Sequence, residues 1–416
     1  MSDIVKIDFL GHQGDGIAHE NGNAIYVPYS LEGEEIEVEG DSAQREFVSV
    51  KSASKDRIDP FCRHFGSCGS CQLQHFDHDA YLDWKVDVLK TTLKLSGIEH
   101  PIEPIKSYPR ASRRRVVLTG MRTQAGIVFG FSERNSNKIV GIKGCPVLLS
   151  ELEAALPFAR DISRLFAPRH GSIRANILVC ENGIDLSIEV NKEKEQKSDA
   201  NLVREAITHP SMAHFIRLSV DGETVLEKER PVLKAGDTLV CPPPSAFVQA
   251  NEAAEQDMAD LVTKHLKSCK KVIDLFCGFG PFALRLAKKS EVIASEFNQP
   301  ALDMLDRAWR ETGGKLKKIS VEKRDLSRRP FAFLELKYID GVVFDPPRAG
   351  AEFQCTHLAK SNVKKIAAIS CDPKTLARDL KILIEGGFSI KSITPIDQFA
   401  FSHHLETVVL LERKKK

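Results

Sequence analysis

The stretch "VIDLFCGFGPFALRLA", residues 272–287, decides the fold of the second half of the chain. A short apolar run carries Asp274 near its end, a turn with Gly278 and Gly280 follows, and a helical pattern starts at once. A second strand-like run, "EVIASE", ends on Glu296, 22 positions after Asp274. Glycines let a backbone approach a nucleoside, and an acid at the second strand tip can accept from ribose hydroxyls. The pattern therefore predicts a nucleoside-binding strand–turn–helix unit.

Strand-like and helix-like runs alternate from about residue 250 onward, which indicates a mostly parallel sheet with helices on both faces. We expect helices at 251–267, 281–289, 299–312, 352–360 and 374–385. We expect strands at 271–276, 291–296, 318–325, 339–345, 363–370, 388–397 and 406–413. Because the last two strands follow each other closely, the sheet is expected to finish antiparallel. We therefore predict an α/β Rossmann-like domain over residues 241–416.

Composition points to an ordinary globular protein of two or three domains. The 416 residues are 42% hydrophobic and carry a formal charge of +2. No run approaches the ~18 apolar residues of a membrane span, and the first residues hold acids without an apolar signal core. Ten cysteines without a secretory signal indicate the cytoplasm, where clustered cysteines more often bind metal or do chemistry than form disulfides.

The first half of the chain reads as mainly β. Residues 1–52 contain four short strand-like runs separated by turns, at 5–10, 24–29, 34–40 and 46–52, which suits an OB-type barrel over residues 1–55. A cysteine-bearing segment at 62–71 and an amphipathic helix at 80–95 follow. Residues 113–240 look mainly β with one helix around 150–166, and the charge-rich interval 191–200 is expected to be an exposed loop.

Charge is distributed unevenly over this first half. Residues 1–55 hold four basic and eleven acidic side chains, a formal −7, whereas residues 56–150 hold fourteen and nine, a formal +5. The densest basic run contains Arg110, Arg113, Arg114 and Arg115. Phosphate contact and a solvated basic face explain this run equally well.

Two further acids end later strands of the predicted parallel sheet. Asp325 closes the third strand and Asp345 the fourth, and the carboxyl ends of parallel strands meet at one edge, where such folds bind ligands. The turn lacks the G-x-G-x-x-G spacing of a dinucleotide site and has no arginine placed for a pyrophosphate. An adenosine without pyrophosphate fits better, which points to S-adenosylmethionine. Ordinary surface acids are the alternative interpretation of Glu296 and Asp325.

The segment "SCDP" puts Cys371 at the tip of the fifth predicted strand, and Glu406 starts the last strand. A buried cysteine is most often inert packing, Asp345 can simply cap its turn, and Glu406 can be a solvated edge residue. One reaction would use all three positions. Carbon 5 of uracil becomes nucleophilic when a thiolate adds to C6, and a carboxylate must then remove the C5 proton. We expect this site to lower the pKa of Cys371 and to accept a base flipped out of its stack.

Two rival interpretations remain beside this one. Cytosine-5 methyltransferases use the same thiolate addition, but the RNA enzymes typically carry a second cysteine after the Asp-Pro of the fourth strand, where this chain has Asp345-Pro346-Pro347. A non-catalytic RNA-binding or ribosome-assembly factor would be expected to lack the nucleophile or the base, and both are present here.

The whole chain resembles the S-adenosylmethionine-dependent RNA uridine-5-methyltransferases, most closely their iron–sulfur bacterial rRNA branch. The motifs that carry the resemblance occur in order: "GDGIAHENGNAIYVPYSLEGEEIEV", "CRHFGSCGSCQLQH", "FVQAN", "DLFCGFGPF", "DPPRAG", "SCDPKTLARDL" and "HHLETVVLLER". The resemblance implies a TRAM domain over 1–55, a central domain with a [4Fe–4S] cluster over 56–240, and a methyltransferase domain over 241–416. It also implies an RNA substrate, 23S rRNA in preference to tRNA, and we expect a monomer.

Residue roles follow from the same resemblance. It assigns Cys371 as the nucleophile and Glu406 as the base. It assigns contacts to the cofactor to Gln249, Phe276, Pro281, Glu296, Asp325 and Asp345. An asparagine often stands in the family where this chain has Pro281, so only the backbone of Pro281 can serve.

Three cysteines lie close together in the sequence, Cys62-x5-Cys68-x2-Cys71, and Cys145 could supply a fourth thiolate. Four sulfurs suit tetrahedral zinc or an iron–sulfur cluster, and spacing cannot separate the two. The resemblance favours [4Fe–4S]. Because the predicted reaction needs no redox step, we expect the cluster to be structural or to shape the RNA site. Cys277 is expected to be packing in the glycine turn.

Overall fold

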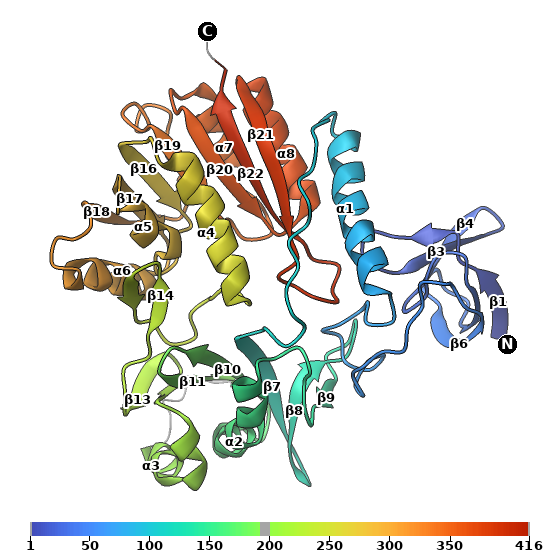
Figure 1. The fold of residues 1–416 in the computed structure, drawn as a ribbon. Coiled ribbons are helices and arrows are strands. Elements are labelled where there is room, and N and C mark those ends of the chain that lie inside the picture. The colour runs from blue at the N-terminus through green and yellow to red at the C-terminus, as the bar shows by residue number, and fades with distance from the viewer. Residues whose placement is uncertain (1, 192–199, 415–416) are drawn as a thin grey trace.

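The computed structural model describes residues 2–191 and 200–414. The predicted loop at 191–200 therefore lies almost wholly outside the described residues. Figure 1 shows the C-terminal sheet and its helices at the top, a second sheet below them, and the first strands of the chain at the right.

The C-terminal sheet confirms the predicted alternation. Its seven strands run in the order β18-β17-β16-β19-β20-β22-β21. The strands are β16 (Lys271–Leu275), β17 (Glu291–Glu296), β18 (Ile319–Lys323), β19 (Gly341–Phe344), β20 (Lys365–Ser370), β21 (Phe388–Ile396) and β22 (Glu406–Arg413). β22 pairs antiparallel with both β20 and β21, as predicted, and the other pairs are parallel.

Helices cover both faces of this sheet because its strands are apolar on both sides. The helices are α4 (Glu252–Leu266), α5 (Pro281–Leu286), α6 (Gln299–Glu311), α7 (Glu352–Lys360) and α8 (Pro373–Glu385). Successive side chains of a strand point to opposite faces. Val272 accordingly packs in the core under α4, α5 and α6, whereas Ile273 packs in the core under α7 and α8.

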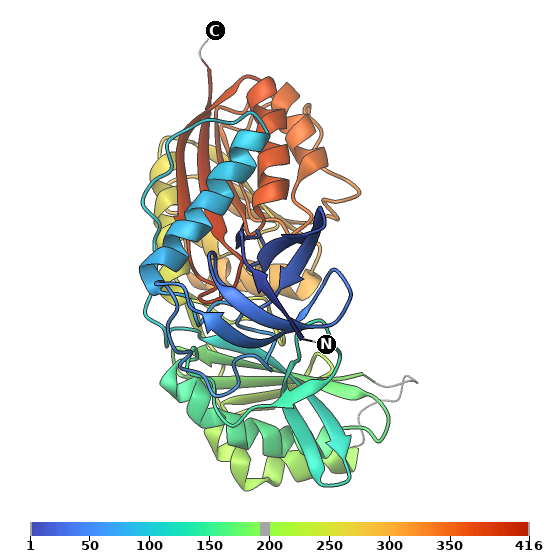
Figure 2. The ribbon, with the colours of Figure 1, turned by 90° about the vertical axis from the view of Figure 1, so that its right-hand side faces the viewer.

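Helix α1 (His78–Leu95) joins this C-terminal core although it comes early in the sequence. It starts two residues before the predicted position because the Asp77 side chain accepts from the amides of Asp79 and Ala80. Leu89 and Leu93 are buried in the core on the α7–α8 face, and α1 lies beside α8 (Figures 1 and 2). The first half of the chain therefore helps to build the sheet that carries the predicted site.

The central sheet has the order β13-β12-β11-β10-β7-β8-β9, with α2 (Ser150–Phe166) packed on it. The strands are β7 (Arg115–Thr123), β8 (Gly126–Ser132), β9 (Ile139–Gly141), β10 (Ser172–Cys180), β11 (Gly183–Asn191), β12 (Arg217–Val220) and β13 (Glu223–Glu227). A hairpin follows, β14 (Leu233–Ala235) and β15 (Thr238–Val240). The prediction of one helix was incomplete, because α3 (Ala200–Thr208) and a 3₁₀ turn (Pro210–His214) also pack against α2. Both are short, nine and five residues, and α3 begins at the end of the charge-rich interval, so its amphipathic pattern was not recognised.

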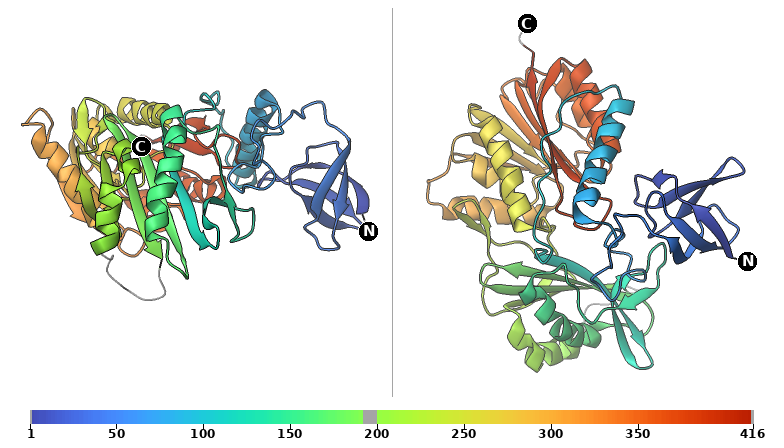
Figure 3. Two further views of the ribbon diagram at one scale, coloured as in Figure 1. Left: turned by 90° about the horizontal axis from the view of Figure 1, so that it is seen from below. Right: turned by 45° about the vertical axis from the view of Figure 1, so that its right-hand side comes forward.

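The first strands form two three-stranded sheets, β1-β5-β6 and β2-β3-β4, around a small core (Figure 3). They are β1 (Ser2–Lys6), β2 (Phe9–Leu10), β3 (Gly16–Glu20), β4 (Asn23–Val27), β5 (Glu35–Glu39) and β6 (Glu46–Ser52). The predicted β character is confirmed. The predicted first strand is divided into β1 and β2, and β3 was missed because "GIAHE" is short and polar at its end. In the described part of the chain, no helix combines the length and apolarity needed to cross a membrane.

A buried carboxylate ties the central and C-terminal parts together. Glu255 on α4 lies 2.6 Å from Arg114, just before β7, and 3.2 Å from Arg285 on α5. All three side chains are almost fully buried, and the one carboxylate pairs with both guanidinium groups inside the protein. This contact fixes the end of β7 against the helices beside the glycine turn.

Candidate active site

The turn after β16 departs from ordinary backbone geometry. Phe276, Gly278 and Gly280 have φ values of 58°, 53° and 87°, in the left-handed region that favours glycine. A Cβ on Gly280 would come within 2.3 Å of the Leu305 side chain, whereas a Cβ on Gly278 would meet only open space. For Phe276 this conformation costs roughly 1 kcal/mol or more. Pro281 then starts α5 with its fixed φ.

Glu296 lies at the neighbouring strand tip and binds the turn directly. Its carboxylate accepts from the Gly278 amide at 3.2 Å and from the Phe297 and Asn298 amides at 2.7 and 2.9 Å. Asp325 follows β18, the next strand, and one of its oxygens caps its own turn through Ser327 and Arg328. The tips of β17 and β18 therefore present Glu296 and Asp325 side by side, as predicted, although each of the two acids also bonds to its own turn.

Asp274 adds a buried acid to which sequence reasoning assigned no role. It is only 1% exposed, and its Oδ2 has no hydrogen-bond partner among the described residues. Burial raises its pKa well above the ordinary value, with smaller contributions from Asp345 and Glu296. An acid inside an otherwise apolar strand was the available signal.

A chain of hydrogen bonds joins the fourth strand tip to the last strand. The Gln249 amide donates to Asp345 Oδ2 at 2.8 Å. Gln398 Nε2 donates to Gln249 Oε1 at 2.7 Å and to Glu406 Oε1 at 3.0 Å. Gln249, Gln398 and Glu406 are at most 5% exposed. Gln398 was missed in the sequence, where its only signal is a polar residue two positions after the end of β21.

Strand pairing places Cys371 opposite Glu406. Ser370 of β20 pairs with Thr407 of β22 in antiparallel register, so the next residue of one strand faces the preceding residue of the other. Directly opposed residues have Cα atoms roughly 4.5–5.5 Å apart. The structure therefore brings the two predicted catalytic residues together at one sheet edge.

Burial and neighbouring charges at this edge favour the protonated forms of Glu406, Asp345 and Cys371. Burial, followed by the charge of Asp345, raises the pKa of Glu406 to about 8, and burial raises the pKa of Asp345 to about 7. Burial and then the Glu406 and Asp345 carboxylates raise the pKa of Cys371 to about 12. The expectation of a lowered pKa for Cys371 is thus wrong for the protein alone. Arg348 opposes the two carboxylates but does not outweigh them.

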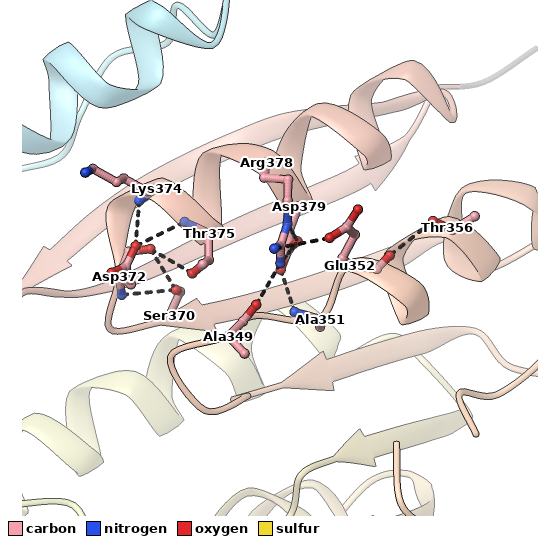
Figure 4. A network of polar contacts seen from close by, with 10 residues as sticks. All are labelled: Ala349, Ala351, Glu352, Thr356, Ser370, Asp372, Lys374, Thr375, Arg378 and Asp379. Atoms are coloured by element: carbon pink, nitrogen blue, oxygen red, sulfur yellow. Dashed lines mark hydrogen bonds and ion pairs between the residues drawn. The ribbon is translucent and has the colours of Figure 1, made fainter. Parts of the chain in front are cut away.

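The turn that carries Cys371 is tied to the turn after Asp345 (Figure 4). The Asp372 side chain caps α8 by accepting from the Lys374 and Thr375 amides at 2.8 and 3.1 Å. Asp379 on α8 accepts from the Ala351 amide at 2.6 Å, and Arg378 donates to the Ala349 carbonyl at 2.9 Å. These bonds hold the two strand tips in a fixed relation. Between them, Gly350 has φ 75°, and a Cβ there would lie 2.5 Å from the Arg378 side chain.

The active-site loop, residues 397–405, leads into Glu406 and is held by α1. Lys85 Nζ donates to Asp397 Oδ1 at 2.5 Å and to the His404 carbonyl at 2.6 Å. The Tyr81 hydroxyl donates to Asp397 and accepts from the Phe401 amide at 2.9 Å. Lys85 and Asp397 are 1% and 2% exposed at their side chains. A buried ion pair from the first half of the chain therefore positions the loop before Glu406.

His403 and His404 lie on this loop with ring centroids 3.9 Å apart. His404 Nε2 is 2.7 Å from Arg348 Nη2, so the loop reaches the turn after Asp345. Burial, reinforced by neighbouring positive charges, lowers the pKa of His403 to about 4 and that of His404 to about 3. Both rings are neutral near pH 7.

The four predicted metal-binding cysteines line one cavity. Cys62, Cys68, Cys71 and Cys145 face it together with Phe65, Phe131, Pro146 and Val147. Among the described residues, no group of three or more His, Cys, Asp or Glu side chains forms a site for a single metal ion. A single zinc ion would hold its sulfurs roughly 3.8 Å apart, given Zn–S bonds of about 2.3 Å. The four thiols line one small cavity of about 20 Å³, so the residue chemistry fits a group bound by all four sulfurs.

The charge of Arg113 supports this fit. Burial lowers its pKa, while Cys145 and Cys71 act in the opposite direction, so its guanidinium lies within electrostatic reach of two of the four sulfurs. Its Nε donates to the Arg115 carbonyl at 2.9 Å, and no carboxylate pairs with it in the described part of the chain. A half-buried cation of this kind suits a site that gathers negative thiolate charge.

Comparison with known proteins identifies the family. Residues 233–414 match the family described as tRNA (Uracil-5-)-methyltransferase. A protein of Mesorhizobium japonicum described as an uncharacterized RNA methyltransferase is 44% identical over 100% of this chain and 99% of its own length. The chain belongs to the RNA uracil-5-methyltransferase family.

Two further comparisons extend this result. The 23S rRNA (uracil(1939)-C(5))-methyltransferase of Vibrio vulnificus is 29% identical over 98% of this chain and 96% of its own length. The crystal structure of the Pyrococcus abyssi tRNA (uracil-54, C5)-methyltransferase has a TM-score of 0.74 at 24% identity and covers 98% of this chain and 99% of its own. The second likeness shows that the two proteins share a fold over their whole length.

Stability should depend on pH through Glu406. Because the pKa of Glu406 is raised to about 8 from 4.5, the folded state keeps between these values a proton that the unfolded state has released. Raising the pH therefore lowers the free energy of unfolding. Glu406→Gln should gain stability relative to wild type between about pH 5 and about pH 9, measured by urea unfolding. Glu412 lies on the same strand, but its pKa is lowered, so Glu412→Gln should not gain stability in this pH range. A difference between Glu406→Gln and wild type that does not change with pH would contradict this reading.

Removing the buried cation of the active-site loop should be costly. Lys85→Met leaves Asp397 buried without its charge partner and should lower the free energy of unfolding by about 3 kcal/mol. Lys85→Met/Asp397→Asn should recover part of this loss, because neither charge remains. Lys90→Met, on an exposed position of α1, is the matched control. Equal urea midpoints for Lys85→Met and Lys90→Met would show that the ion pair does not hold the loop.

Proposed function

We propose that the protein transfers a methyl group from S-adenosylmethionine to C5 of a uridine in RNA. The observation that carries the proposal is the register of β20 and β22, which sets Cys371 across from Glu406. The family supports the reaction class, and the hydrogen-bond chain from Asp345 to Glu406 joins the cofactor edge to the proposed base. A cytosine-5 enzyme is disfavoured because Pro346 and Pro347 follow Asp345.

In this proposal the Cys371 thiolate forms a bond to C6 of uracil, and the electron pair moves to C5, which takes the methyl group. Glu406 then removes the C5 proton, the C6–S bond breaks, and the thiolate is released. S-adenosylmethionine supplies the electrophilic methyl group. Gln249, Phe276, Pro281, Glu296, Asp325 and Asp345 would hold it, Pro281 through its backbone alone.

The raised pKa values suggest how the residues share these steps. Near pH 7 both Cys371 and Glu406 are mostly protonated in the protein alone. The positive charge of the bound cofactor would favour the ionisation of both groups, and Arg348 would favour that of Cys371. Gln398 donates to the Glu406 oxygen and keeps the carboxylate oriented, while the second oxygen, Oε2, has no partner in the described part of the chain. This unpartnered oxygen is the one proposed to accept the C5 proton.

Substitution of the two residues should separate the two halves of the reaction. Cys371→Ala should abolish methyl transfer to unmodified RNA, because no C6 bond can form. Glu406→Gln should accumulate a covalent protein–RNA adduct, since the methyl group is transferred but the C5 proton stays. Radiolabelled methyl transfer and denaturing gels measure both outcomes. Cys277→Ser, in the glycine turn, is the control cysteine. Normal turnover by Glu406→Gln would refute its role as the base.

We also propose that Cys62, Cys68, Cys71 and Cys145 hold a [4Fe–4S] cluster, in a central domain over 56–240 between a TRAM domain over 1–55 and the methyltransferase domain over 241–416. Helix α1 lies inside the second range but packs on the sheet of the third. The shared cavity and the unpaired Arg113 support the cluster. Bonds from the cysteine sulfurs to the cluster would hold the Cys68–Cys71 loop in place.

Metal analysis of protein purified without oxygen tests this cluster. We expect about four irons per chain with iron–sulfur visible absorption. Cys145→Ser should lose both, whereas Cys180→Ser, a buried cysteine outside the cavity, should keep both. Colourless protein that binds one zinc ion after reconstitution would overturn the assignment.

The RNA substrate is proposed to be 23S rRNA. The relative from Vibrio vulnificus and the four-cysteine cavity support this choice, whereas the matched family description and the Pyrococcus structure favour tRNA. A gene-deletion strain should lack one 5-methyluridine in 23S rRNA, mapped by mass spectrometry of RNA fragments, and the plasmid-borne gene should restore it. A missing 5-methyluridine in tRNA instead would assign the other substrate.

A further inference from the structure

A second polar pocket lies beside the active-site loop. Its walls come from four separate segments: Gln13 between β2 and β3, the cysteine loop with Gly69, Ser70 and Gln72, residues 131–135 at the end of β8, and His403. Its volume is about 330 Å³. This lies at the lower end of the range for small-molecule sites and suits one planar ring with its sugar.

The walls of the pocket are bonded to one another, so its shape is built into the fold. The Gly69 amide donates to the Ser132 carbonyl at 3.0 Å, and the Gln72 amide donates to the Phe401 carbonyl at 2.9 Å. Arg134 forms an ion pair with Asp15 at 2.7 Å, which joins the central sheet to the first strands. The pocket therefore sits where three parts of the chain meet.

Three residues that line the pocket each carry a buried polar atom with no partner within the described ranges. These atoms are Gln72 Oε1, Arg134 Nη1 and His403 Nδ1. Burying such atoms costs roughly 1–3 kcal/mol each unless they are hydrogen-bonded. The residues of the pocket wall therefore retain both donor and acceptor capacity for a ligand.

The charge of the pocket favours a base over a phosphate. Arg134 is already paired with Asp15, Glu133 adds a carboxylate, and His403 is neutral because its pKa is lowered to about 4. A phosphate would meet two acids and no free cation among these groups. Amide and hydroxyl groups beside the Phe131 ring instead match the edge and face of a nucleobase.

The position of the pocket relates it to the reaction. His403 is three residues before Glu406, and its ring lies against His404, which contacts Arg348. We propose that this pocket binds a nucleobase that flanks the target uridine in the RNA, which rests on the proposed function. A flanking base held here would help to keep the target strand unstacked beside Cys371.

Two exposed pocket residues allow a test that leaves the core intact. Gln13→Ala/Asn135→Gly removes two side chains, and glycine suits the left-handed backbone of Asn135, φ 53°. Gln44→Ala, an exposed glutamine near the first strands and outside the pocket, is the matched control. The probe is the shortest RNA fragment that wild type methylates, with a series in which each flanking nucleotide in turn is abasic.

The double variant should bind the intact RNA about tenfold more weakly by fluorescence anisotropy, with a smaller change in the rate at saturating RNA. At one position, an abasic nucleotide should weaken RNA binding by wild type and leave RNA binding by the variant almost unaffected. That position identifies the base that the pocket holds. Equal RNA affinities of the variant and wild type would overturn the proposal. So would an affinity difference between them that stays the same with every abasic RNA, because it would indicate that the two side chains contact the RNA backbone. Absence of methylation by wild type on any RNA would instead refute the proposed function.

Discussion

The antiparallel pairing of β20 and β22 is the constraint on which the site depends. A parallel last strand would carry Glu406 to the far edge of the sheet, whereas the reversed strand starts at the edge where the parallel strands end. Cys371 then faces Glu406, and the acids that follow β16 to β19 lie along the same edge. The glycine turn, the capped α8 and the turn after Asp345 hold this edge in place.

Residues from the first half of the chain complete the site. Lys85 and Tyr81 on α1 hold Asp397, the backbone after Cys71 bonds to Phe401, and Arg114 binds Glu255 beside the glycine turn. The cysteine loop thus contacts the same loop that leads to Glu406. The proposed cluster would therefore brace the active-site loop from outside, although the proposed reaction has no redox step.

Much of this could be predicted from the sequence, because it depends on local patterns. Alternating apolar runs predicted the C-terminal strands and helices, and the convergence of strand tips predicted the meeting of Cys371 and Glu406. Other features depend on contacts between distant segments. Gln398 and Lys85 became visible only in the fold. The pKa of Cys371 is raised rather than lowered because of burial first, and then because Glu406 and Asp345 approach from two other strands. Helix α3 and strand β3 were missed because both are short, nine and five residues.

The central claim is that Cys371 bonds to C6 of a uracil ring. Substrate RNA with 5-fluorouridine at the target position tests it most directly, because a fluorine at C5 cannot leave as a proton and the adduct persists. After incubation with S-adenosylmethionine and digestion by trypsin and nuclease, mass spectrometry should find the methylated fluorouridine on the peptide 366–374, at Cys371. A protein that methylates ordinary RNA but forms no such adduct, or forms it on another cysteine, would contradict the account.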